Sequence, residues 1–231
     1  MNGKVVTELG TKAGPNDRIL VNGRPLPARP SAVCVVLNKP AGVVTTRSDP
    51  QQRATVLGLL PPVFTHLFPV GRLDLQSTGL VLLTNDGDLA ARLTHPRYHV
   101  PRTYRVKVTG VPDERALDRL RRGVRLADGR ASAAEVVIER RLPTKTWLRI
   151  TVHEGRTHLV RRLCDAIGHS AEKLQRVAFG PLGLGRLALG ACRVLTPEEV
   201  RALRHATRTA RSGVVGRSVR QRREAGAPSI S

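Results

Sequence analysis

Asp74 is the residue of this chain whose setting best suits chemistry. It lies in the segment PVGRLDLQSTGLVLLTNDG (69–87), between Arg72 and a polar stretch, Gln76-Ser77-Thr78, that leads into an apolar run. A carboxylate can serve as a nucleophile or a general base without a metal, provided that it stays ionised and rigidly aimed. By spacing alone, however, an aspartate in a polar loop is more often a turn residue or a helix cap.

Other chemically capable residues give weaker signals. His153, Glu154 and His158 superficially suggest a zinc protease motif, but their spacing separates the two histidines by roughly 140° on a helix. The glycine-rich GPLGLG (180–185) lacks the Lys-Ser/Thr pair and the helix that follow in a phosphate-binding loop, so we expect a turn. The cysteines have no metal-ligand spacing and lie in apolar contexts, which favours reduced, packed thiols: Cys34, Cys164 and Cys192. The sequence therefore predicts no metal site.

The net charge favours a nucleic-acid partner. The 231 residues include 39 Lys+Arg against 18 Asp+Glu, a formal net charge of +21, and 33 of the basic residues are arginine. Arginine presents a planar fork of donors that binds phosphate and stacks on bases. A GC-rich genome would favour arginine over lysine, but it would not produce the excess over acids. Membrane surfaces are the second choice of partner.

Hydropathy argues against a membrane-spanning protein. No apolar run approaches the ~20 residues that a helix needs to cross a bilayer. The first residues, MNGKVVTELG, contain no apolar secretion segment. We therefore expect a soluble protein of the cytoplasm.

The chain divides into three segments by composition. Residues 1–31 contain turn signals at Asn2-Gly3 and Asn22-Gly23, each flanked by β-formers, which predicts a small β unit followed by a stiff proline-rich connector. Residues 32–205 form the main domain. Residues 206–231 are basic and rich in Arg, Ser and Gly, so we expect disorder there and a nonspecific RNA tether rather than a bare solvated run.

Periodicity in the main domain predicts strands and short helices that alternate without a strict βαβ rhythm. The helix over 112–123 is indicated by acids in its first turn, arginines in its last and Gly123 after it. We expect strands at 33–38, 79–85, 103–110, 131–140, 146–154 and 173–180, and helices at 88–93, 112–123, 156–168 and from 197 onward. This pattern predicts an α+β domain on a largely antiparallel sheet.

The residues around Asp74 also resemble a known family. GRLD (71–74) followed by STGLVLLTNDG (77–87) resembles the active-site signature of the bacterial ribosomal pseudouridine synthases. The branch it resembles comprises the type A enzymes, which act on the small ribosomal subunit, together with the type B enzymes of the large one. Chance does not explain the length of the match. It continues, in order, through LNKPAGVVTT (37–46), LTHPRY (93–98), RTY (102–104), EGR (154–156), VRRL (160–163) and RVAFGPL (176–182).

The resemblance implies the pseudouridine synthase catalytic fold, an isomerase acting on ribosomal RNA, and no cofactor. Asp74 would act at the ribose C1′ or C2′ of the target uridine, so that the base is released, rotates while bound and rejoins through C5. Tyr104 would stack on the extruded base and compensate for lost stacking. Arg161 would lie against Asp74 and, with Arg72, keep it ionised. Without the resemblance, a core position for Tyr104 would be preferred, and spacing alone would not decide between a solvated face and the active site for Arg161.

Substrate or RNA contacts are expected from further residues of the matching motifs: Arg72, Leu80, Arg102, Arg156, Arg162 and Lys39. Among these, Leu80 would line the pocket. One stretch departs from the branch, because Thr157-His158-Leu159 stands where Asn-Arg-Gln is usual. Arg156-Thr157-His158 is instead similar to the sister branch of large-subunit enzymes, and that alignment favours Arg161 over Arg162 as the active-site arginine.

The N-terminal block resembles the β-rich second half of an S4 RNA-binding domain, on NGKVV (2–6) and VNGR (21–24). The two helices with which that domain normally begins have no counterpart in this sequence. Residues 1–31 are therefore expected to be a partial S4-like module.

Large-subunit rRNA is the expected substrate, because RSDPQ (47–51) and the closing strand resemble the type B enzymes; small-subunit rRNA is the alternative. A catalytically silent rRNA-binding or assembly factor is a rival of another class, disfavoured by the presence of Asp74, Tyr104 and Arg161. A glycosidase-like hydrolase would need a second carboxylate near Asp74, and none stands out in the nearby sequence.

Overall fold

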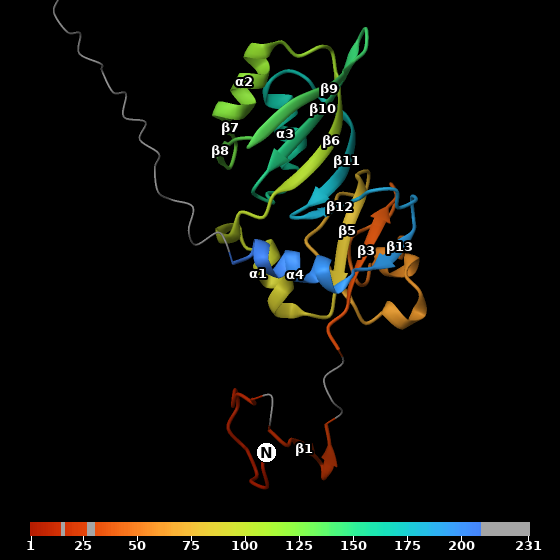
Figure 1. Cartoon of the computed structure of the whole chain (residues 1–231), viewed down its shortest axis with the longest axis vertical. Coiled ribbons are helices and arrows are strands. Elements are labelled where there is room, and N and C mark those ends of the chain that lie inside the picture. Colours follow the sequence, from red (N-terminus) through yellow and green to blue (C-terminus); the bar gives the residue numbers. More distant parts are fainter. Residues whose placement is uncertain (15–16, 27–30, 209–231) are drawn as a thin grey trace, which may run out of the picture. The chain divides into compact units, whose positions relative to one another are not determined.

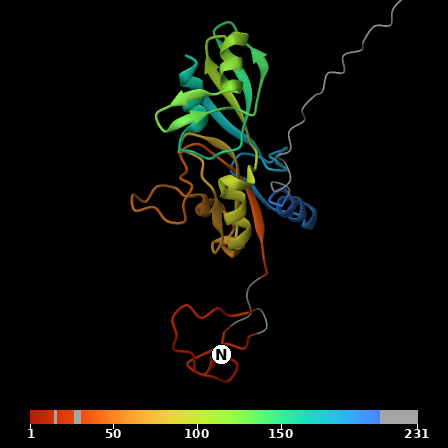
Figure 2. The same cartoon turned by 90° about the vertical axis from the view of Figure 1, so that its left-hand side faces the viewer.

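The computed structural model describes residues 1–14, 17–26 and 31–208 (Figures 1 and 2). The chain divides into two compact units, Met1–Ala32 and Val33–Ser231, which we describe separately. Most of the basic tail expected over 206–231 lies outside the described residues.

The N-terminal unit contains one two-stranded hairpin. Strands β1 (Leu20–Val21) and β2 (Arg24–Pro25) are joined through Asn22 and Gly23, which both have a positive φ as this tight turn requires. The turn at Asn2-Gly3 also forms, but the strand expected after it does not, and Val5 is 91% exposed. The side chain of Asn2 stabilises this turn without a strand pair. Its amide nitrogen donates to the carboxylate of Asp17, and its amide oxygen accepts from the backbone N–H of Arg18.

The second unit is built on a nine-stranded mixed sheet, with seven strands in the order β13-β3-β5-β11-β6-β10-β9; β4 also pairs with β5, and β12 with β11. All pairs are antiparallel except β5 with β11. The strands are β3 (Cys34–Lys39), β4 (Phe68–Val70), β5 (Thr78–Thr84), β6 (Arg102–Thr109), β9 (Glu135–Arg141), β10 (Lys145–Val152), β11 (Ala171–Phe179), β12 (Leu182–Gly183) and β13 (Cys192–Val194). A small hairpin, β7 (Val124–Leu126) with β8 (Gly129–Ala131), stands apart from this sheet.

Short helices flank the sheet, as Figure 1 shows: α1 (Gly87–Thr94), α2 (Glu114–Arg122), α3 (Leu159–Ala166) and α4 (Pro197–Ala206), with 3-10 turns η1 (Val56–Leu59), η2 (Pro62–Phe64) and η3 (Pro96–Tyr98). Side-chain hydrogen bonds cap the N-termini of two of the helices. Thr196 caps α4 in a capping box with Glu199, and Asp113 caps α2. None of the helices in the described ranges is long and apolar enough to cross a membrane.

Two hydrophobic clusters explain why the sequences of β3 and β5 are continuous apolar runs. On β5, Val81 and Leu83 join the cluster that also contains the buried faces of α2 and α3. The alternate residues Leu80 and Leu82 join a second cluster with α1 and α4. Both faces of β5 are thus buried, whereas β6 buries one face and exposes the other, in the predicted period of two.

The α+β fold with a largely antiparallel sheet is confirmed. The predicted strands and helices form, with ends that differ by a few residues. The expected strand over 131–140 begins only at Glu135, because Ala131 belongs to the β7–β8 hairpin. The short strands β4, β7, β8, β12 and β13 were not anticipated.

Candidate active site

Asp74 lies in the turn that connects β4 to β5. The turn is closed by the backbone N–H of Ser77, which donates to the carbonyl of Asp74 at 3.0 Å. Its other side is fixed by Thr45, whose hydroxyl donates to the carbonyl of Leu73 and accepts from the N–H of the same residue. The Asp74 side chain is 32% exposed, so the carboxylate is held by backbone on both sides while remaining accessible.

Lys39 supports this turn from beneath. Its side chain is fully buried, and its ammonium donates to the carbonyls of Pro40, Leu75 and Ser77 at 2.8, 3.2 and 2.8 Å. Burial lowers the pKa of Lys39 to about 8, and the negative charge of Asp74 opposes this shift. Lys39 therefore fixes the backbone that directly follows Asp74, at Leu75 and Ser77.

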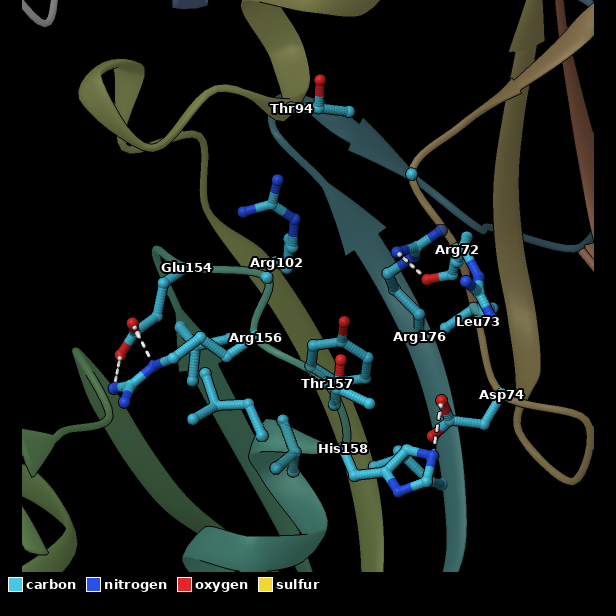
Figure 3. A pocket seen from close by; sticks show the side chains of 17 residues that line it. Arg72, Leu73, Asp74, Thr94, Arg102, Glu154, Arg156, Thr157, His158 and Arg176 are labelled. Carbon is cyan, nitrogen blue, oxygen red and sulfur yellow. Dashed lines mark hydrogen bonds and ion pairs between the residues drawn. The ribbon is translucent and has the colours of Figure 1, made fainter. Parts of the chain in front are cut away.

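Two cationic or ionisable side chains from the start of α3 approach the Asp74 carboxylate. Nε2 of His158 lies 3.4 Å from Oδ1, and Nε of Arg161 lies 3.9 Å from Oδ2. Arg161 is oriented by a second bond, from Nη1 to the carbonyl of Ala171 at 2.9 Å. His158 adopts a left-handed backbone conformation (φ 52°) directly before the helix, which directs its ring toward Asp74 (Figure 3).

Asp74 opens into a cavity of about 320 Å³, within the range of small-ligand sites. Tyr104 lines the same cavity and is 8% exposed, so its phenol ring forms part of the wall. Aliphatic side chains complete the apolar part of the lining: Leu73, Val152, Leu159, Val160 and Leu174. The structure thus brings together an acid, an aromatic ring and a guanidinium from separate parts of the sequence.

Four arginines also line this cavity. Arg72 is exposed, whereas Arg102 and Arg176 are buried. Arg156 binds Glu154 through Nε and Nη2, at 2.8 Å each, and Asp128 through Nη1 at 3.0 Å. Figure 3 shows the Glu154–Arg156 pair on the side of the cavity away from Asp74. Among the residues that the structure describes, no group of three His, Cys, Asp or Glu side chains could hold a metal ion.

The sequence and the fold of the chain match known proteins. The family profile described as RNA pseudouridylate synthase matches residues 33–166, more than half of the chain. This chain belongs to that family. It is 41% identical over 207 residues to a ribosomal large subunit pseudouridine synthase B of Bacillus subtilis, covering 88% of this chain and 84% of the relative. An uncharacterized RNA pseudouridine synthase of Mycobacterium tuberculosis is 43% identical over 206 residues, covering 87% and 80%.

A crystal structure of a pseudouridylate synthase superposes with a TM-score of 0.68 at 29% identity, covering 87% of this chain and 86% of the other. The pseudouridine synthase fold predicted from the sequence is therefore confirmed. The protein is an RNA pseudouridine synthase, an isomerase.

Three residues expected to contact substrate do not line the cavity of this synthase. Leu80 is fully buried in the cluster with α1 and α4, because alternate residues of β5 face opposite sides of the sheet. Lys39 is fully buried beneath the turn and has no exposed surface for RNA. Arg162 points from α3 to Asp128, which it binds at 2.9 Å. The expectation that Leu80 lines the pocket is wrong, and the aliphatic walls come from other residues.

Arg72 was expected to help keep Asp74 ionised. In the described part of the chain, the ion pairs of Asp74 are with His158 and Arg161 and not with Arg72. The contact of Arg72 with the site is through its backbone, whose carbonyl accepts a hydrogen bond from Nη1 of Arg176.

Sequence reasoning missed three ionisable residues of the cavity: His158, Glu154 and Arg176. His158 stood in a rejected zinc motif and in a departure from the family branch, and Glu154 stood in the same zinc motif and in the matching EGR motif, but neither was assigned a role in the site. Arg176 stood in a matching motif, but an arginine in a strand gives no sign of its burial. Its position is decided by the pairing of β11 with β5, a contact between residues about 100 positions apart.

Proposed function

We propose that this synthase isomerises a uridine of large-subunit ribosomal RNA to pseudouridine, with Asp74 as its catalytic carboxylate. The observation that carries the proposal is the position of Asp74. It is anchored by backbone on both sides, paired with Arg161, and open to a cavity that Tyr104 also lines. The neighbouring guanidinium of Arg161 supplies a counter-charge to a carboxylate that must act as a nucleophile or base.

In the proposed reaction, the bond between ribose C1′ and uracil N1 breaks and a bond between C1′ and uracil C5 forms. Asp74 acts at C1′ or C2′ to release the base, which remains in the cavity and rotates. N1 then carries a proton, and the proton originally on C5 is lost to solvent. Atoms and charge balance without an oxidant, a reductant or a metal.

The wall of the cavity suits a nucleotide that has left its stack. Extruding a base from folded RNA costs a few kcal/mol, and stacking on an aromatic ring compensates for part of that cost. We assign this role to Tyr104. Arg72, Arg102 and Arg156 line the cavity and would contact the RNA around the target, whereas Arg162 would act on RNA outside it.

Large-subunit RNA is proposed because similar proteins of Bacillus subtilis and Pseudomonas aeruginosa are both named ribosomal large subunit pseudouridine synthase B. Small-subunit RNA is the second candidate. We also propose a cytoplasmic location, because ribosomal RNA would be encountered there. The resemblance of residues 1–31 to part of an S4 domain would make this segment an additional RNA contact.

Asp74→Asn tests the proposed chemistry, since it keeps the size of the side chain and removes its charge. Wild type and variant are incubated with ribosomal RNA transcribed in vitro, and pseudouridine is mapped by chemical labelling and reverse transcription. We expect one or few modified sites with wild type and none with the variant. Arg201→Gln on α4, where the arginine is 69% exposed, is the control and should modify RNA like wild type.

Other outcomes would identify the rivals. No pseudouridine with wild type, with RNA binding retained, would leave a catalytically silent rRNA-binding factor, whereas equal modification by wild type and Asp74→Asn would show that Asp74 is not the catalytic carboxylate. Free uracil in place of pseudouridine would indicate a hydrolase, with Glu154 as the second carboxylate in the cavity. Sites confined to small-subunit RNA would correct the substrate alone.

A further inference from the structure

Arg176 is buried in a way that its contacts within the protein do not explain. It is 2% exposed, yet it lines the cavity. Nε donates to the carbonyl of Leu80 at 2.7 Å and Nη1 to the carbonyl of Arg72 at 3.5 Å. Nη2 is buried without a hydrogen-bond partner in the structure. An unpaired donor on a buried cation is costly, which points to a partner that arrives from outside.

A second buried arginine, Arg102, lies close by. The guanidinium carbons of Arg102 and Arg176 lie 5.4 and 5.3 Å from the centroid of one ring, Phe179. Arg102 is 8% exposed and bonded only by carbonyls, of Leu93, Val100 and His153, at 3.3 Å each. Burial lowers the pKa of Arg102, and the positive charge of Arg176 adds to that effect.

The carboxylates of the cavity are engaged elsewhere. Asp74 pairs with His158 and Arg161, and Glu154 pairs with Arg156. In the described ranges, no ion pair joins Arg102 or Arg176 to an acid. Two buried positive charges at one end of the cavity therefore lack a counter-charge. Figure 3 shows both guanidinium groups toward Thr94, and Asp74 with His158 at the opposite end.

The lining leaves room at this end. Gly71 and Gly155 both line the cavity, and a Cβ added at Gly155 would lie 3.7 Å from the guanidinium carbon of Arg102. A Cβ at this distance would be in ordinary van der Waals contact, so residue 155 lies directly against this guanidinium. A group that enters here meets charge and donors rather than hydrocarbon.

We infer that Arg102 and Arg176 form a phosphate subsite, which binds a phosphodiester of the extruded nucleotide while Asp74 faces its ribose. The inference rests on the proposed function, because it assumes that the ligand is RNA. A phosphate is the anion that RNA always supplies within a few bonds of the ribose. A uracil carbonyl could satisfy Nη2 of Arg176, but it would leave both charges uncompensated.

Binding of small probes tests the subsite without turnover. Uridine, uridine 5′-monophosphate and uridine 3′-monophosphate are titrated into the full chain at low salt, and affinities are measured from NMR chemical shifts. We expect at least one monophosphate to bind wild type roughly 10-fold or more tightly than uridine, as a charge-assisted hydrogen bond at a buried site implies. Equal affinities for all three probes would overturn the inference.

Variants assign the preference to residues. Arg176→Gln should reduce monophosphate affinity to the level of uridine and leave uridine itself unchanged; Arg201→Gln removes the same charge from α4 and should change neither. If Arg176→Gln weakens uridine and monophosphate equally, Arg176 contacts the base or only supports the fold, and the subsite is rejected. If Arg176→Gln does not fold, Arg102→Gln is tested in the same way, and an unchanged preference for the monophosphate in that variant rejects the subsite.

Failure of this inference is distinguishable from failure of the proposed function. If the protein prefers the monophosphate but forms no pseudouridine in ribosomal RNA, the result supports the phosphate subsite and contradicts the proposed substrate or chemistry. If the protein forms pseudouridine but shows no preference for the monophosphate over uridine, the result supports the proposed function and contradicts the phosphate subsite.

Discussion

At the scale of residues, the charge of Asp74 is coupled to a lysine that never meets solvent. The ammonium of Lys39 donates to two carbonyls of the turn, Leu75 and Ser77, and to the carbonyl of Pro40, and the same negative charge that serves the reaction helps to keep it protonated. Removal of the proton from Lys39 would release one of those bonds. The rigidity of Asp74 and the protonation of Lys39 are therefore linked.

This coupling predicts a pKa change. Asp74→Asn removes the charge that raises the pKa of Lys39, so the pKa should fall below its wild-type value of about 8. The measurement is an NMR titration of lysine 13Cε signals, in which Lys39 is recognised because an exposed lysine titrates near 10.4. Glu154→Gln, which removes another acid of the cavity, is the control and should leave the pKa near 8. An unchanged or raised pKa in Asp74→Asn would contradict the proposed coupling.

At the scale of elements, the site depends on the parallel contact between β5 and β11. The two strands pair at Thr78 with Gln175 and at Gly79 with Arg176. Gly79 has φ +106°, and a Cβ there would lie 2.3 Å from the carbonyl oxygen of Arg176. Only glycine permits this approach. The contact positions Arg176 against the strand that directly follows the Asp74 turn.

Gly79→Ala should therefore separate the two strands. The positive φ alone costs about 1–3 kcal/mol for a residue with a side chain, and the clash adds to that cost. We expect a lower free energy of unfolding, measured by urea denaturation, together with loss of pseudouridine formation. Gly87→Ala is the matched control, because nothing lies within 4 Å of its Cβ position at the start of α1. It should be neutral or stabilise by about 0.4–1 kcal/mol. Equal effects of the two substitutions would show that Gly79 is not required.

At the scale of the whole molecule, charge governs how the synthase meets RNA. The net charge of +21 gives a long-range attraction that does not depend on sequence, whereas the cavity provides the local fit. Residues 209–231, which lie outside the described residues, contribute five arginines and one glutamate to this charge. Their contribution to binding is best separated by salt dependence.

Truncation after Arg208 should lower the salt dependence of RNA affinity if the tail acts as a tether. Each phosphate contact that is lost reduces the slope of log K against log salt by roughly 0.7–0.9. A full-length variant with the five tail arginines replaced by glutamine should match the truncation, because charge rather than length sets the slope. An unchanged slope in both proteins would mean that the tail is only a solvated run.

Local sequence determined most elements of the fold. The alternation of β6, the caps of α2 and α4 and the continuous apolar runs of β3 and β5 all depend on residues a few positions apart, so their signals are readable along the chain. The GRLD motif likewise singled out Asp74, and the family resemblance indicated Tyr104 and Arg161 as its companions.

Tertiary structure alone decided which side chains share the cavity. Leu80 and Arg176 are both buried, but the side of the sheet that each faces follows from strand pairing and not from residue type. Lys39 matches a motif that suggests RNA contact, yet folding places it beneath the turn with no access to solvent. His158 and Glu154 reach the site because β10 and α3 return to it. Such contacts join residues far apart in sequence, and no local pattern encodes them.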